Sequence, residues 1–82
     1  MPKTLRSARQ VRLVKLLIQH RKAVGMSQAS LAEKLGRYQS VVAAMESGSR
    51  RVDAIELIDI ADALGFDVHE MIDDLRSLPK EF

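Results

Sequence analysis

The 82-residue sequence has the length of one small domain, and its lack of cysteine excludes disulfides and thiolate metal sites and suits the cytoplasm, where we expect the protein. No apolar run reaches the roughly 18 residues of a membrane-spanning helix. The net charge of +2 hides an asymmetry, because residues 1–51 hold eleven Lys and Arg against two acids and residues 52–82 hold two against nine. A basic half is typical of proteins that bind nucleic acid, unless its charges only solvate helix faces.

Glycines and capping residues mark the helix boundaries. Glycine closes a helix in the left-handed conformation at little steric cost, and four stretches of helical periodicity end at Gly25, Gly36, Gly48 and Gly65. Capping-box spacing follows Ser7, Asp53 and Asp67, and Ser27 can cap the second helix. In chain order we predict helices over residues 8–24, 28–35, 38–47, 54–64 and 68–77, with no strand. The predicted fold is therefore all-α, in a single domain over residues 1–82.

Both ends of the chain extend beyond this helical pattern. Residues 1–6 are basic, and we expect a flexible arm that either reaches DNA or stays disordered. Residues 78–82 form a short C-terminal tail in the same interpretation.

The second and third helices are too short to be stable alone, so packing must hold them. Their spacing is typical of a helix-turn-helix, in which the second helix of the motif enters the DNA major groove. That geometry needs a small residue at the crossing, here Ala32, and a glycine in the turn, here Gly36. It also needs apolar anchors facing inward, which are Leu31, Leu35, Val42 and Met45.

The two C-terminal helices carry most of the acids and more apolar residues than one face needs. Helix 54–64 has Leu57, Ile60, Ala61 and Leu64 on one face and Ile55 and Ile58 on another, which predicts a central helix. Along the last helix and the tail we expect mostly core residues in the stripe Val68, Met71, Ile72, Leu75 and Leu78. Its distal part provides the candidate dimer contacts Met71, Leu75, Leu78 and Phe82. We expect Asp59, Asp62, Asp73 and Asp74 to form a solvated surface turned away from DNA.

From about Leu17 to Met71 the sequence resembles the lambda-repressor-like helix-turn-helix family, which includes Cro, phage repressors and XRE-type proteins. The resemblance rests on "R…GMSQASLAEKLG", "QSVVAAMESG" and "RRVDAIELIDIADALGFDVHEM". It implies a compact five-helix bundle with the helix-turn-helix at the second and third helices. It also implies a cytoplasmic, bacterial or phage-type transcription regulator, expected to be a repressor, that binds a palindromic operator in double-stranded DNA as a homodimer.

The resemblance also implies residue roles. Base edges would be read by Gln39, Ser40 and Ala44, and a salt bridge would join Arg21 to Glu46. Helical geometry independently places residues 40 and 44 on one face while Val42 and Met45 point inward. The expected phosphate contacts are Gln28, Arg37, Tyr38, Ser49, Arg50 and Arg51.

Three departures from the family pattern lie around the third helix. Position 37 is usually apolar but is arginine here, and position 38 usually opens the helix with Ser, Thr or Pro but is tyrosine. For Arg37 and Tyr38 a DNA contact and a structural role stay open, and Tyr38 could pack on the second helix. The outward positions 43 and 44 are both alanine, so direct base readout is sparse or shape readout matters more.

Other functional classes find little support. No nucleophile–base pair or glycine-rich phosphate loop is visible, so we predict neither an enzyme nor a cofactor. His20 and His69 fall on different helices without a third ligand, so no metal site is expected. The alternatives to a repressor are the antitoxin of a toxin–antitoxin pair, whose partner would be a toxin, and the controller protein of a restriction system. An antitoxin usually adds a segment that wraps the toxin, whereas this domain accounts for nearly the whole sequence.

Overall fold

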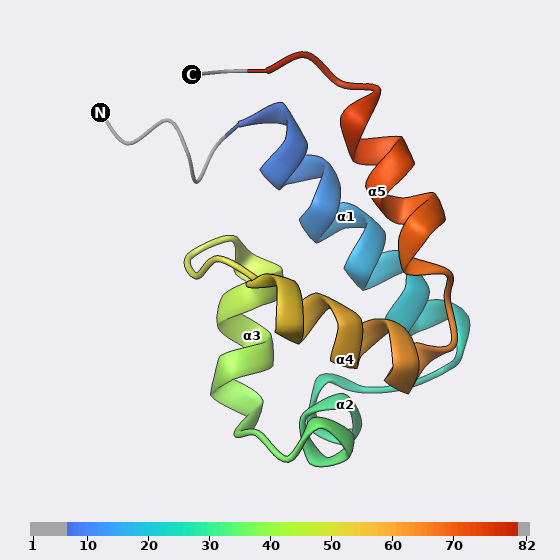
Figure 1. The fold of residues 1–82 in the computed structure, drawn as a ribbon. Coiled ribbons are helices and arrows are strands. Elements are labelled where there is room, and N and C mark those ends of the chain that lie inside the picture. Colours follow the sequence, from blue (N-terminus) through green and yellow to red (C-terminus); the bar gives the residue numbers. More distant parts are fainter. Residues whose placement is uncertain (1–6, 81–82) are drawn as a thin grey trace.

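The computed structural model describes residues 7–80 and contains five helices in that range. They are α1 (Ala8–Ala23), α2 (Gln28–Leu35), α3 (Gln39–Ser47), α4 (Ala54–Leu64) and α5 (Val68–Arg76) (Figure 1). The predicted all-α fold is confirmed, and each helix boundary differs from the expectation by one residue at most. The expected basic arm, residues 1–6, and Phe82 lie outside the described residues.

Capping explains most of the helix starts. Ser7 and Ser27 accept hydrogen bonds from the backbone N–H groups of Gln10 and Ser30 at 3.1 and 3.0 Å. Asp53 and Glu56 form the complete reciprocal capping box. The same expectation for Asp67 is wrong, because its carboxylate accepts from the His69 N–H at 2.8 Å and not from residue 70.

The core lies between the five helices, and each of them contributes buried side chains to it. α1 packs against α3 and α5, and α2 packs against α3 and α4. The buried apolar side chains are Leu13, Leu17, Leu31, Ala32, Val42, Met45, Leu57, Ile60, Ala61, Leu64 and Met71. Leu35, an expected anchor, is half-buried against this cluster.

α4 buries one apolar face, so the prediction of a central helix is wrong. Ile55 and Ile58 keep 67% and 45% of their surface exposed, whereas Ile60 keeps 2%. The reason is that α2 and α5 pack on α4, and among residues 7–80 no element covers the face that carries Ile55 and Ile58.

The apolar residues of the stripe on α5 differ in burial. Met71 is 4% exposed and is part of the core, so it has almost no surface to offer a second subunit and we withdraw it as a dimer contact. Leu75 is half-buried against the core, and Leu78 is half-buried while its carbonyl accepts two hydrogen bonds from the Arg9 guanidinium. Ile72 is 41% exposed and is the member of the stripe that lies outside the core.

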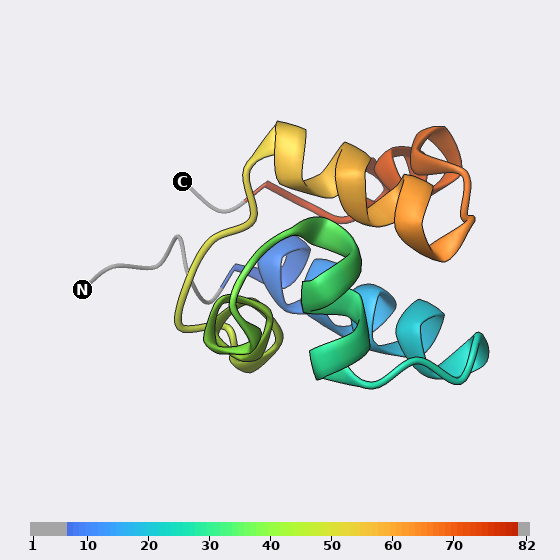
Figure 2. The same cartoon turned by 90° about the horizontal axis from the view of Figure 1, so that it is seen from below.

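The arrangement separates α3 from α5. In both views α1 runs between them, with α3 at one end of the molecule and α5 along the opposite side (Figures 1 and 2). The acids Asp59, Asp62 and Asp73 are exposed on α4 and α5. None of the helices within residues 7–80 combines the length and the apolar character needed to cross a bilayer.

Candidate DNA interface

The turn between α2 and α3 has the tight geometry that its glycine permits. Gly36 has φ +69°, in the left-handed region, and its N–H donates to carbonyls at the end of α2. The Arg37 N–H donates to the Ala32 carbonyl at 2.9 Å, which closes the turn. Ala32 is 2% exposed at the contact between the two helices, so a larger side chain there would force them apart.

α3 presents its first turn to solvent. Val42 and Met45 face the core at 1% and 2% exposure, whereas Gln39 and Ser40 are exposed and Ala44 is half-exposed. These outward residues stand on the face that the sequence assigned to base reading. The side chains on this face that can form hydrogen bonds with bases, Gln39 and Ser40, both lie at its N-terminal end.

Tyr38 occupies the N-cap position of α3 but makes no capping hydrogen bond. Its side chain is 83% exposed, which rules out the alternative that it packs on α2. The first backbone N–H groups of α3 therefore stay available to an acceptor outside the protein.

A bidentate ion pair attaches α3 to α1. Arg21 donates from Nε to Glu46 Oε2 at 2.7 Å and from Nη2 to Oε1 at 2.9 Å. Its Nη1 donates to the Met26 carbonyl at 2.8 Å. The two side chains keep 11% and 7% of their surface, and the hydrogen bonds to Glu46 raise the pKa of Arg21 above its usual range. This pair fixes the angle at which α3 leaves the core.

Gln28, the expected phosphate contact at the start of α2, also binds Glu46. Its Nε2 donates to Glu46 Oε1 at 2.9 Å, so the side chain joins α2 to the same ion pair. The remaining amide hydrogen and the backbone N–H groups at the start of α2 are the donors left for a phosphate. Its phosphate role stays a prediction.

The loop after α3 holds three further predicted phosphate contacts in different environments. The backbone N–H groups of Ser49 and Arg50 both donate to the Ala44 carbonyl, at 3.1 and 3.2 Å, which folds the loop back onto α3. The Ser49 hydroxyl lies 3.0 Å from that of Ser47. Arg51 is exposed, and its side chain has no hydrogen bond or ion pair within residues 7–80.

Glu56 connects two of the predicted phosphate contacts, and the sequence identified it only as a capping residue. Its Oε2 accepts from Arg37 Nη1 at 3.0 Å and from Arg50 Nη2 at 2.6 Å. Its Oε1 accepts from Arg50 Nη1 at 2.9 Å and from the Asp53 N–H at 3.0 Å. These bonds, led by those from Arg50, lower the pKa of Glu56 from 4.5 to about 2 although burial opposes the shift.

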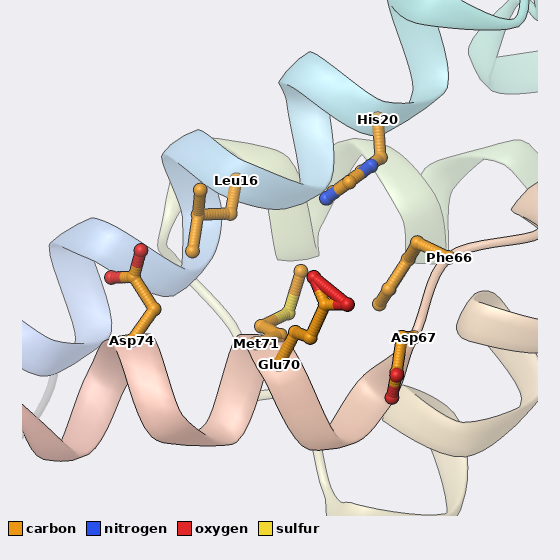
Figure 3. A pocket seen from close by; sticks show the side chains of 7 residues that line it. All are labelled: Leu16, His20, Phe66, Asp67, Glu70, Met71 and Asp74. Carbon is orange, nitrogen blue, oxygen red and sulfur yellow. The ribbon is translucent and has the colours of Figure 1, made fainter.

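A pocket of about 180 Å³ lies between α1 and α5, and none of the residues that line it belongs to α3 (Figure 3). His20 and Phe66 stack there with ring centroids 4.3 Å apart, and the carboxylates of Asp67, Glu70 and Asp74 line the same space. Three carboxylates do not suit a phosphate ligand, so the pocket is not part of the candidate interface. Across the described part of the chain, no group of three or more potential ligands is arranged to hold a metal ion.

Comparisons with known proteins agree with this geometry. A helix-turn-helix family model matches residues 17–71. An XRE-family like protein from Pseudomonas syringae pv. tomato str. DC3000 has a similar solved structure, with 37% identity, a TM-score of 0.83 and 95% of each chain covered. A search of curated proteins found no match. The chain therefore belongs to the XRE family of helix-turn-helix proteins, whose members are DNA-binding regulators of transcription.

Proposed function

We propose that the protein is a transcriptional repressor of the cytoplasm that binds a palindromic operator as a homodimer, with α3 in the major groove. The observation that carries the proposal is the first turn of α3. Gln39 and Ser40 stand free in solvent on a helix whose opposite face is buried and whose angle is held by the Arg21–Glu46 pair. A rigid helix with free polar side chains is the device that reads base edges.

Base reading in this proposal rests on few side chains. The Gln39 carboxamide can bond bidentately to adenine, and the Ala44 methyl group can touch a thymine methyl. Ser40 can donate to or accept from either type of base pair. Because positions 43 and 44 offer no hydrogen bond, the shape and deformability of the operator supply part of the specificity.

Phosphate contacts surround the reading helix. Arg51, Ser49 and Tyr38 are exposed at the two ends of α3, and the guanidinium groups of Arg37 and Arg50 are each more than a third exposed. Within residues 7–80, most of the exposed acids lie on α4 and α5 or at their N-caps, with Glu33 on α2 as the exception. Because α5 lies across the molecule from α3, it faces away from a duplex docked on α3.

In this proposal the two subunits meet through the C-terminal end of each chain. Leu75 and Leu78 keep part of their surface, and Phe82, beyond the described residues, follows them in sequence. A twofold dimer would place two copies of α3 about 34 Å apart, one turn of B-DNA, which explains why the operator should be palindromic.

Selection from random duplexes tests the proposal. We expect an enriched site with two inverted half-sites whose centres are about 10 base pairs apart. Sedimentation of the protein with this duplex should show two chains on each site, and a reporter with the site inside its promoter should be silenced. Recovery of no preferred sequence, with equal and salt-sensitive binding to all duplexes, would contradict it.

A further inference from the structure

A single carboxylate reaches residues beyond both ends of the recognition helix. Arg37 lies in the turn before α3, and Arg50 lies in the loop after it, as the path of the ribbon from α2 to α4 shows (Figure 1). Glu56, in the first turn of α4, binds both guanidinium groups through its Oε2 atom, at 3.0 and 2.6 Å. The two cations are thereby brought to one point beside α3.

The members of this cluster differ in exposure. The Glu56 side chain keeps 9% of its surface, whereas those of Arg37 and Arg50 keep 39% and 36%. The negative charge is hidden below two positive charges that solvent, and therefore a ligand, can reach. Because Glu56 is buried behind the two arginines, it can hold them in place without directly repelling an approaching anion.

The charges and donors of the cluster are not balanced within the protein. One carboxylate compensates one of the two cations, which leaves one positive charge. Asp53 acts on Arg50 only through space, and Asp59 forms no ion pair with either arginine among the described residues. Each guanidinium has five N–H donors. Arg37 uses one of them and Arg50 uses three, so four donors remain unused on Arg37 and two on Arg50. One phosphodiester has the single negative charge and the acceptor oxygens that match this remainder.

We propose that Glu56 is a positioning residue that assembles Arg37 and Arg50 into one site for a single backbone phosphate of the bound DNA. The inference rests on the proposed function. Without the carboxylate the two like charges repel, and each long side chain regains its rotamer freedom. Each arginine would then have to be ordered again when DNA binds, which lowers affinity.

The variant Glu56→Gln separates this role from simple charge. Glutamine keeps the capping box, because an amide oxygen also serves at that position, but it removes the charge that holds the arginines. If Glu56 were only an acid near DNA, its removal would tighten binding. If it positions the arginines, binding weakens although the protein becomes more positive.

The matched control is Asp53→Asn. It makes the same change of charge in the same turn, and asparagine is as good an N-cap as aspartate. It leaves all the bonds from Arg37 and Arg50 to Glu56 in place. We expect Asp53→Asn to bind DNA as tightly as the wild type or more tightly.

The experiment measures fluorescence anisotropy of the full chain on the selected operator and on a random duplex, across a salt series. For Glu56→Gln we expect about tenfold weaker operator binding and a salt slope reduced by about one contact, with the circular dichroism of the wild type. Operator binding that is equal to or tighter than that of the wild type overturns the proposal.

A second experiment tests whether Glu56→Gln weakens binding only because it disturbs the fold of α4. It repeats the substitution in a protein that lacks both arginines. In the double variant Arg37→Gln with Arg50→Gln, Glu56→Gln should no longer weaken binding, because no arginine remains to be positioned. An equal loss in that background overturns the proposal. If the wild type selects no operator, the proposed function fails, and the sign of the Glu56→Gln effect on the random duplex still decides whether Glu56 positions the arginines.

Discussion

Two arginine–carboxylate systems stabilise α3, the helix proposed to enter the major groove, and they differ in solvent exposure. The dry system is Arg21 with Glu46, and the wet system is Glu56 with Arg37 and Arg50. Arg21 and Glu46 keep 11% and 7% of their side-chain surface, and all three Arg21 nitrogens donate to protein acceptors. Arg37 and Arg50 keep more than a third of theirs around Glu56. The first pair is too buried for a ligand to reach, whereas Arg37 and Arg50 have unused donors that solvent reaches. The same chemistry therefore serves the fold in one place and an external anion in the other.

The difference in burial also changes what each pair contributes to stability. Removing one partner of a buried pair leaves the other charge uncompensated, which costs about 3–5 kcal/mol. A solvated guanidinium that loses its partner is stabilised by water instead, so the cost falls toward that of a surface pair.

Glu46→Ala should break the dry system with the largest effect. Arg21 would lose both bonds to the carboxylate, and Gln28 would lose its acceptor on Glu46. We expect a loss of about 3–4 kcal/mol in the free energy of unfolding, measured by denaturation, and a lower melting temperature. DNA binding should weaken together with stability, because α3 loses its attachment to α1.

The comparison for this variant is Glu46→Gln, which keeps an acceptor for Arg21 and should lose less stability than the alanine variant. Unchanged stability with tighter DNA binding in Glu46→Ala would show that Glu46 is only a surface acid, and would refute the role of the dry system as an anchor.

Gln39→Ala tests the surface that both systems support. Gln39 is exposed, so its truncation should leave the free energy of unfolding nearly unchanged. We expect a loss of about 1–3 kcal/mol on the operator and little change on random DNA. Arg51→Ala is the contrasting variant. Because Arg51 is proposed to contact a phosphate, its removal should weaken binding to both duplexes equally and reduce the slope of log affinity against log salt by about one. Equal effects of Gln39→Ala on the two duplexes would show that α3 docks differently.

The low pKa of Glu56 predicts how the wet system responds to acid. Its pKa is about 2 in the folded protein and 4.5 without its partners, so folding favours the ionised form. Its contribution is complete above about pH 4.5 and is lost as the pH falls toward 2. Because both arginines are more than a third exposed, solvent screens the interaction and we expect only about 1 kcal/mol. The difference in unfolding free energy between wild type and Glu56→Gln should shrink from pH 6 to pH 2, and a difference that does not depend on pH would contradict this.

The sequence predicts local features well and contacts across loops poorly. Helix ends follow from glycines and caps, which act within a few residues. Burial of α4 did not follow, because both of its faces carry apolar residues and the neighbouring helices decide which face is covered.

The Glu56 cluster was missed for the same reason. Arg37 and Glu56 are 19 positions apart, and the fold of two loops brings them together. The available signal was Arg37 itself, a charge where the family usually has an apolar residue, which implies a nearby counter-ion. The family resemblance, in contrast, named both Arg21 and Glu46, and the structure contains that ion pair.

Asp74→Ala should have the smallest effect, because it removes a solvent-exposed ion pair. It shows how little such a pair contributes to stability compared with the buried Arg21–Glu46 pair. Asp74 on α5 accepts from Arg12 Nε at 2.9 Å and from Nη2 at 3.2 Å, with 34% and 45% of the two side chains exposed. The bonding is bidentate, as between Arg21 and Glu46, but the site is wet and lies far from α3. We therefore expect a loss of about 0–1 kcal/mol in unfolding free energy and no change in operator affinity. A loss as large as that of Glu46→Ala would show that bidentate geometry, and not burial, sets the strength of these pairs. A change in operator affinity alone would mean that α5 contributes to DNA binding, either directly or through the proposed dimer contact at Leu75 and Leu78.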